Sequence, residues 1–150
     1  MERTLIIVKP EGIQRGLIGN IISRFEQRGL KLIGLKLIQI TPELAEQHYG
    51  VHKGKPFFPG LVKHITSDPV VVGVVEGPKA ISVVRTTMGA TNAAEAPPGT
   101  IRGDYALEIG FNIIHGSDGP ETATQEIDLF FKPEELVSYN LVTAPWIYEQ

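Results

Sequence analysis

Cysteine is absent from all 150 residues of the sequence. A disulfide framework, a thiolate nucleophile and a cysteine-type zinc site are therefore excluded, which suits a reducing cytoplasmic location. Long apolar runs are also missing near the start. The first run, LIIV at residues 5–8, ends at Lys9 and is too short for a signal-peptide core or a membrane span.

An excess of positive charge is missing as well. The chain has 14 Lys and Arg against 17 Asp and Glu, a formal net charge of -3. General nucleic-acid binding and membrane-surface binding usually come with a basic excess, so neither is expected here. With 42% hydrophobic and 21% charged residues, the composition is that of an ordinary globular protein. We predict a single domain over residues 1–150, which is long enough to bury roughly 70% of its unfolded surface.

Familiar catalytic and phosphate-binding signatures are absent too. The sequence contains no GxxxxGK[ST] loop, no GxGxxG, no GxSxG and no HExxH. If the protein binds phosphates, it must use scattered cations instead of a glycine-rich loop. The candidates are Lys9, Lys53, Lys55, Arg85 and Arg102. Each of them, taken alone, is most often a solvated surface charge.

Hydrophobic periodicity predicts alternating strands and helices. TLIIV, residues 4–8, reads as a buried strand, and the spacing of Ile18, Ile21, Ile22 and Phe25 predicts one face of a helix that stops at Gly29. Further along, strands are predicted at 30–40, 69–77 and 111–116, and helices at 42–49, near Leu61, after Pro78 and from 118 to about 131. Residues 89–104 are predicted to form a long loop. Asp118 and Glu121 have the form of a capping box.

This order of strands and helices favours a ferredoxin-like fold. We predict an α/β (α+β) sandwich of βαββαβ order, with an antiparallel sheet, inserted helices and a C-terminal extension. The extension, residues 132–150, has no clear periodicity and reads as an extended tail. On a domain of this size, a neighbouring subunit is one surface on which such a tail can pack.

Several single residues have both a chemical and a structural interpretation. His115 follows a short apolar run and precedes a Gly-Ser-Asp turn, so it is either a reactive group or a packed histidine. Asn112 equally suits the end of a strand, and Ser117 and Asp118 suit a helix cap. Phe57 and Tyr49 would ordinarily be core and half-buried helix residues.

Taken together, the motifs of the chain closely resemble those of nucleoside diphosphate kinases. The matching segments run in the family's order over essentially the whole chain: TLIIVKPEG, HKGKPFF, MGATN, PGTIRGDY, NIIHGSD at 112–118, and WIYE. NIIHGSD is the most specific of them. The resemblance implies an enzyme that transfers the γ-phosphoryl group of ATP or another nucleoside triphosphate to a nucleoside diphosphate, in two steps through a phosphohistidine.

The resemblance also implies a role for each matched residue. His115 would be the nucleophile, since an imidazole near neutral pH has a free ring nitrogen. Glu126 would accept a hydrogen bond from the other ring nitrogen, although on its own it reads as part of a solvated helix face. Ser117 would lie beside this pair. The implied cofactor is Mg held by the nucleotide phosphates, with Asp118 near it through water.

The remaining matched residues would bind the nucleotide. The resemblance implies that Phe57 stacks on the base, which tolerates any base because every base has a π face, and that Ile109 and Leu61 complete that pocket. Lys9 and Asn112 would contact the ribose and its 3′-hydroxyl. Phosphate oxygens would be bound by Tyr49, Arg85, Thr91 and Arg102, as phosphoryl transfer requires charge neutralisation and positioning.

Two departures from the family pattern concern assembly. Ala93 follows MGATN where the family usually has proline, and AEAPPG lacks a lysine common before PG. That loop lies at subunit contacts in the family, so the departures concern oligomer strength. The tail resembles those of hexameric members, which implies a homohexamer, with a tetramer as the alternative. Two other functions are weighed against the kinase: a catalytically silent nucleotide-binding scaffold and a nucleic-acid-binding regulator.

Overall fold

In the computed structural model, which describes residues 1–149, the chain forms a four-stranded antiparallel sheet. The strands are β1 (Glu2–Val8), β2 (Lys31–Ile38), β3 (Val70–Gly77) and β4 (Ile114–Gly116). Their order across the sheet is β2-β3-β1-β4, and every neighbouring pair is antiparallel. This topology confirms the predicted ferredoxin-like sandwich.

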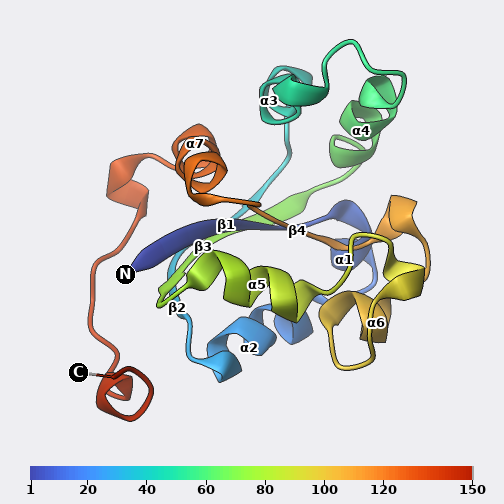
Figure 1. Ribbon diagram of the computed structural model, residues 1–150. Helices are drawn as coiled ribbons and strands as arrows, with labels where there is room; N and C mark the ends of the chain where they lie inside the picture. Colours follow the sequence, from blue (N-terminus) through green and yellow to red (C-terminus); the bar gives the residue numbers. More distant parts are fainter. Residues whose placement is uncertain (150) are drawn as a thin grey trace.

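Helices cover both faces of the sheet (Figure 1). α2 (Ile18–Arg28) and α5 (Ala80–Met88) pack on one face, and α3 (Pro42–His48), α4 (Phe58–Ile65) and α7 (Pro120–Phe130) pack on the other. Strand side chains alternate between faces, so Ile6 and Val8 join one apolar core and Leu5 and Ile7 join the other. β1 is therefore buried on both sides, and its end is held rigidly where α1 (Pro10–Gln14) begins.

Local signals placed several helix ends correctly. Gly29 ends α2 in the left-handed region, with φ of 105°, which glycine adopts without a Cβ clash. Pro42 is the first residue of α3, and the Thr41 hydroxyl accepts a hydrogen bond of 3.2 Å from the backbone N–H of Leu44. Each signal is local, because the capping groups lie within one turn of the helix they end.

The segment 89–104 is more ordered than the predicted loop. It contains a 3₁₀ turn at Ala93–Glu95 and the start of a short helix, α6 (Ile101–Tyr105). The Thr100 hydroxyl caps α6 by accepting from the N–H of Gly103 at 3.0 Å. The prediction of a loop up to residue 104 was therefore wrong at its end, where α6 begins. A helix of this length is too short to show an apolar period in the sequence.

The last strand is shorter than predicted. Residues 111–113 do not belong to β4, because Ile113 has a φ of +60° and breaks the extended backbone. A β-branched residue in this conformation is strained and persists only where its surroundings hold it. The Glu11 carboxylate holds it by accepting a bond of 3.1 Å from the Ile113 N–H. The predicted strand at 111–116 is therefore confirmed only at Ile114–Gly116.

The predicted capping box at the start of α7 does not form. Pro120 is the first residue of α7, which makes Gly119 the N-cap and leaves Asp118 outside the helix. No side chain caps this end. Asp118 is thereby left exposed at the surface of the turn.

The C-terminal extension lies along the outer side of its own chain (Figure 1). The N–H of Val137 donates to the carbonyl of Ile33 at 2.8 Å, and the Tyr139 hydroxyl donates to the carbonyl of Leu32. The Tyr148 hydroxyl reaches the carbonyl of Gly29. The predicted tail is thus anchored beside β2. Across residues 1–149, no helix is both long enough and apolar enough to cross a membrane.

Candidate active site

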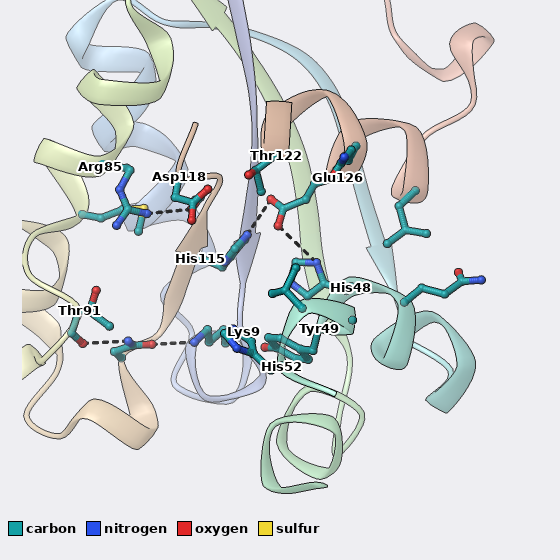
Figure 2. A pocket seen from close by; sticks show the side chains of 18 of the residues that line it. Lys9, His48, Tyr49, His52, Arg85, Thr91, His115, Asp118, Thr122 and Glu126 are labelled. Carbon is teal, nitrogen blue, oxygen red and sulfur yellow. Dashed lines mark hydrogen bonds and ion pairs between the residues drawn. The ribbon is translucent and has the colours of Figure 1, made fainter. Parts of the chain in front are cut away.

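A pocket of about 810 Å³ collects side chains from elements far apart in the sequence (Figure 2). Its walls come from the end of β1, α3, α5, α6, β4 and α7. Most of the predicted site residues line it, namely Lys9, Tyr49, Arg85, Thr91, Arg102, Asn112, His115, Asp118 and Glu126. The fold therefore brings the predicted nucleophile and the predicted cations into one cavity.

His115 is oriented by a carboxylate. It lies on β4 opposite Ile7 of β1, and its Nε2 is 2.9 Å from Oε1 of Glu126. Ser117, which is fully buried, donates its hydroxyl to the same Glu126 oxygen at 2.6 Å. An ionised carboxylate only accepts, so Nε2 must hold the ring proton, which leaves the lone pair of the neutral ring on Nδ1.

Glu126 is a buried residue of α7 and not part of a solvated helix face, so that interpretation was wrong. The residue is 8% exposed and lies in helical register with Ala123, Ile127 and Phe130, the buried side of α7. The spacing of these three apolar residues was a signal in the sequence, since a carboxylate on an apolar helix face needs a partner. His115 and Ser117 supply that partner.

The Glu126 carboxylate remains ionised despite its burial. Burial by itself raises the pKa of this group, but the hydrogen bonds from His115 and Ser117 and the nearby imidazoles more than offset it. The net result is a pKa below the ordinary value for Glu. A fixed negative charge therefore faces the protonated side of the His115 ring.

His48 is a member of the site that the sequence reasoning missed. Its side chain is 2% exposed, and its Nδ1 lies 3.6 Å from Oε2 of Glu126. The ring meets His115 edge to face, with 4.9 Å between ring centroids. Burial, with a smaller contribution from His115, lowers the pKa of His48 to about 3, so its ring is neutral. The one available signal was its place on α3, three residues after the buried Ala45.

Three cations make the pocket attractive to anions. Lys9 follows β1 directly and donates its Nζ to Oδ1 of Asn112 at 2.7 Å. The Asn112 amide in turn donates to the carbonyl of Thr91 at 2.9 Å. Arg85 donates to the carbonyl of Gly116 at 3.1 Å, and Arg102 completes the set. Lys53 and Lys55, also considered from the sequence, lie outside the lining.

Arg102 both supports the backbone and faces the pocket. It is 4% exposed, and it donates to the carbonyls of Asn112, Gly89 and Ile114 at 3.2, 3.0 and 2.7 Å. These bonds use Nε, Nη1 and Nη2 once each. A guanidinium has five N–H groups, so one on each terminal nitrogen stays available for a ligand. Burial lowers the pKa of Arg102 to about 10, which still leaves it charged near neutral pH.

Tyr49 adds a neutral donor to the pocket. Burial raises the pKa of its hydroxyl to about 12, with smaller contributions from Glu11 and Glu126. The phenol therefore keeps its proton throughout the neutral range. Together with the three cations, it provides the hydrogen-bond donors that phosphate oxygens require.

Four predicted site residues are not part of the lining. Ser117 is fully buried, and its hydroxyl is hydrogen-bonded to Glu126 instead of facing the cavity. Phe57, which is 50% exposed, borders His52 with 5.2 Å between ring centroids. Ile109 is 59% exposed on a 3₁₀ turn, and Leu61 lies on α4. The base-binding roles of Phe57, Leu61 and Ile109 stay predictions.

The site also has a carboxylate suited to a hydrated divalent cation. Asp118 is exposed and lines the pocket, whereas Glu126 is already engaged by His115 and Ser117. Mg²⁺ keeps several waters and is commonly bound through one or two carboxylates together with substrate phosphates. Asp118 fits that pattern.

Comparisons with known proteins point in one direction. The family model described as nucleoside diphosphate kinase matches residues 2–136. The chain is 64% identical over 149 residues to a nucleoside diphosphate kinase of Carboxydothermus hydrogenoformans, covering 99% of this chain and 100% of that one. It is 61% identical over 147 residues to one from Thermomicrobium roseum, covering 98% and 99%.

Solved structures give the same result. A halophilic nucleoside diphosphate kinase from Halobacterium salinarum, in complex with CDP, superposes with a TM-score of 0.96 at 52% identity, covering 99% of both chains. A family protein from Babesia bovis superposes with a TM-score of 0.96 at 48% identity, covering 99% of this chain and 100% of the other.

Proposed function

Since this chain belongs to the nucleoside diphosphate kinase family, we propose that it transfers the γ-phosphoryl group of a nucleoside triphosphate, typically ATP, to a nucleoside diphosphate through a phosphohistidine at His115. Relatives that are 57% to 64% identical support nucleotide phosphoryl transfer as its activity. A catalytically silent scaffold is not favoured, because the nucleophile, its carboxylate partner and the cations are all present in one pocket.

One observation carries the proposal. The hydrogen bond from Nε2 of His115 to the ionised Glu126 assigns the ring proton and leaves a lone pair on Nδ1. His115 is part of the pocket lining, so the ring is accessible to a bound nucleotide. A neutral imidazole in this tautomer needs no separate base to attack phosphorus.

The reaction follows in two steps. Nδ1 attacks the γ-phosphorus, an N–P bond forms, and the bond from phosphorus to the bridging oxygen breaks, which releases the nucleoside diphosphate. The ring becomes positive as it attacks, and the Glu126 carboxylate stabilises that charge through Nε2. A terminal oxygen of a second nucleoside diphosphate then attacks the phosphohistidine, which restores the neutral ring.

The other pocket residues would position the nucleotide. Arg85, Arg102, Tyr49 and Thr91 are proposed to bind phosphate oxygens, and Lys9 with Asn112 to contact the ribose and its 3′-hydroxyl. Phe57 is proposed to stack on the base, with Leu61 and Ile109 beside it. A kinase of this family generally needs a divalent metal. We infer that this metal is Mg²⁺, which the nucleotide phosphates and, through water, Asp118 would hold and which would neutralise phosphate charge.

The direct test is to label the protein. It is incubated with Mg²⁺ and ATP labelled on the γ-phosphate, and free nucleotide is then removed. We expect label on His115 that is labile to acid and stable to alkali, and that passes to added GDP. A folded protein that binds ATP but takes up no label would contradict the phosphohistidine mechanism and support the scaffold.

The Glu126→Gln variant tests the orienting carboxylate. The amide keeps the size of the side chain but removes the charge that stabilises the attacking ring, so we expect turnover to fall by about 100-fold. Nucleotide affinity should change little, because Glu126 faces His115 and not the phosphates. Rapid-mixing kinetics of phosphorylation would measure the loss, and Gln125→Ala, at the preceding position of α7, serves as the matched control. Unchanged phosphorylation in Glu126→Gln would refute this role.

Nucleotide affinity is expected to fall in alkaline solution because of Lys9. Burial lowers the pKa of Lys9 to about 8, so its positive charge is lost as pH rises through that value. We expect the affinity for a nucleoside diphosphate to fall about fivefold between pH 8 and pH 9, as the charged fraction falls. Tyr49 does not contribute, because its pKa is about 12. Calorimetry across this range would measure the change, and affinity that is equally pH-dependent in Lys9→Met would disprove the assignment.

Assembly and location are part of the same proposal. We infer a homo-oligomer, favouring a hexamer over a tetramer, a single domain over residues 1–150, and a cytoplasmic location. Support for self-association comes from the exposed side chains of β2, an edge strand, where Leu35 and Leu37 are 48% and 65% exposed. No dedicated binding of nucleic acid or membrane is expected.

A further inference from the structure

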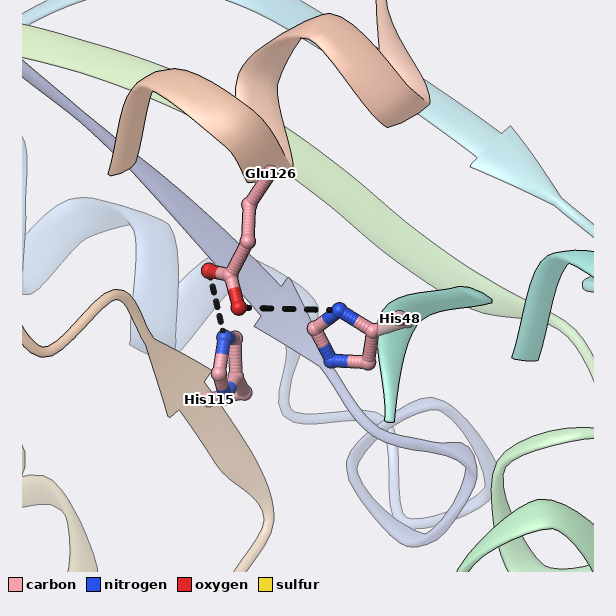
Figure 3. Close-up of side chains that lie close together, drawn as sticks. All are labelled: His48, His115 and Glu126. Atoms are coloured by element: carbon pink, nitrogen blue, oxygen red, sulfur yellow. Dashed lines mark hydrogen bonds and ion pairs between the residues drawn. The ribbon is translucent and has the colours of Figure 1, made fainter. Parts of the chain in front are cut away.

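Three side chains that line the pocket converge from three different elements (Figure 3). His48 comes from α3, His115 from β4 and Glu126 from α7. Each offers one ligand atom, and the three atoms all lie within 4.8 Å of one another. Within this group, Glu126 lies 2.9 Å from Nε2 of His115 and 3.6 Å from Nδ1 of His48, through different carboxylate oxygens.

The Nδ1 atom of His48 has no role in the proposed reaction and no hydrogen-bond partner in the described part of the chain. The side chain is 2% exposed, and at 3.6 Å the Glu126 oxygen is too distant for a hydrogen bond. A buried polar atom without a partner is costly and calls for an explanation. Its direction, toward Glu126 and beside His115, indicates a ligand that all three residues share.

The donor set selects the kind of ligand. Two neutral imidazoles and one carboxylate suit Zn²⁺ and similar divalent transition metals, whereas Mg²⁺ and Ca²⁺ prefer oxygen donors alone. Zn²⁺ binds His nitrogen and carboxylate oxygen at about 2.0 to 2.2 Å, so tetrahedral ligand atoms lie about 3.3 Å apart. The separations of 2.9 and 3.6 Å from the Glu126 oxygens lie on either side of that value. The three ligand atoms lie within 4.8 Å of one another, so the two imidazole rings need to approach by at most about 1.5 Å.

We propose that His48, His115 and Glu126 form a binding site for Zn²⁺ or a related transition-metal ion, separate from the Mg²⁺ carried by the nucleotide. The site has three protein ligands, and its fourth position faces the pocket and would be filled by water. His48 is the residue that distinguishes it, because it completes the set without taking part in phosphoryl transfer.

Occupation of this site would switch off the kinase, a consequence that rests on the proposed function. The metal ion takes the lone pair of Nε2, and the proton held there moves through solvent to Nδ1. A ring bound through one nitrogen and protonated on the other has no lone pair with which to attack phosphorus. The ion also takes the Glu126 carboxylate away from its orienting role. Free Zn²⁺ would therefore inhibit phosphoryl transfer, because the metal-bound ring of His115 cannot adopt the tautomer that attacks phosphorus.

The test measures Zn²⁺ binding directly, without nucleotide. The full-length protein is freed of metal and titrated with Zn²⁺ alone by calorimetry, and Co²⁺ is used in parallel because its visible absorption reports nitrogen and oxygen ligation in a low-coordinate site. We expect one ion per chain in the wild type. His48→Phe and Glu126→Gln should each weaken binding by at least about tenfold, since each removes a metal ligand.

A matched control is available in the same chain. His64 is also paired with a glutamate, at 2.8 Å from Glu11, but residues 1–149 place no third metal-ligating side chain beside this pair. His64→Phe should bind Zn²⁺ like the wild type. The near-isosteric Glu126→Gln keeps the test decisive should His48→Phe fold poorly.

The outcomes separate this inference from the proposed function. A protein that forms phosphohistidine but binds no Zn²⁺, or binds it equally after the His48 and Glu126 changes, would overturn the metal site alone. A protein that binds Zn²⁺ through these residues but takes up no label from ATP would leave the site intact and overturn the kinase mechanism. Zn²⁺ binding together with matching loss of labelling, reversed by a chelator, would support both.

Discussion

Replacement of His115 by alanine is expected to abolish phosphoryl transfer, with turnover lowered by more than about 10⁴-fold. The change removes the only group that receives the phosphoryl in the proposed mechanism, and neither Glu126 nor the pocket cations can replace it. Nucleotide binding should persist, because the phosphate and ribose contacts come from other residues. A coupled assay with ATP and a second nucleoside diphosphate measures the loss.

The control for this variant is another histidine of the same pocket. His52 lines the cavity and meets Phe57 edge to face. Among the described residues, the hydrogen bonds and ion pairs of the Glu126 carboxylate go to His115, Ser117 and His48, and not to His52. His52→Ala should retain at least about a tenth of the wild-type turnover, since it removes no reacting group. Wild-type activity in His115→Ala, with the fold intact by circular dichroism, would refute the mechanism.

The largest loss of stability is expected from Arg102→Met. Methionine fills much of the same volume but leaves the carbonyls of Gly89, Asn112 and Ile114 without their donor. Because buried acceptors without partners are costly, we expect the free energy of unfolding to fall by about 3 kcal/mol. Urea denaturation of the nucleotide-free protein would measure it, and activity should fall as well.

Arg85→Met provides the comparison for that measurement. Arg85 lies in the same pocket but makes a single bond to the backbone, at the carbonyl of Gly116. Its loss should cost about 1 kcal/mol. Equal destabilisation by the two variants would mean that the backbone bonds of Arg102 do not carry its structural role.

The difference between the two arginines also shows how the site is built around strained backbone. Arg102 donates to the carbonyls on either side of Ile113, and Glu11 accepts from the Ile113 N–H. These contacts hold the left-handed conformation of Ile113, with φ of +60°. β4 begins directly after this bend, and the side chain of His115 within β4 faces Glu126. The residues that support this bend were predicted only as phosphate ligands or not at all.

Sequence alone was sufficient for features that depend on neighbours along the chain. The apolar period of α2, its stop at Gly29 and the Thr41 cap of α3 are local, so each could be predicted from a short window. Pro120 is also a local signal for the start of a helix. It places the N-cap of α7 at Gly119, and the predicted capping box at Asp118 therefore does not form. The family resemblance supplied the rest of the site, because several separated motifs matched in order.

What the sequence by itself determined was the βαββαβ order, the family and nine of the residues that line the pocket. Only the tertiary structure decided that Glu126 is buried and not solvated, that Arg102 donates three hydrogen bonds to the backbone, and that His48 lies beside His115 and Glu126. The reason is physical: each of these facts depends on side chains brought together from different elements of the fold. No local pattern encodes a contact between α3, β4 and α7, because burial and pairing at that point arise only when the sheet and helices pack.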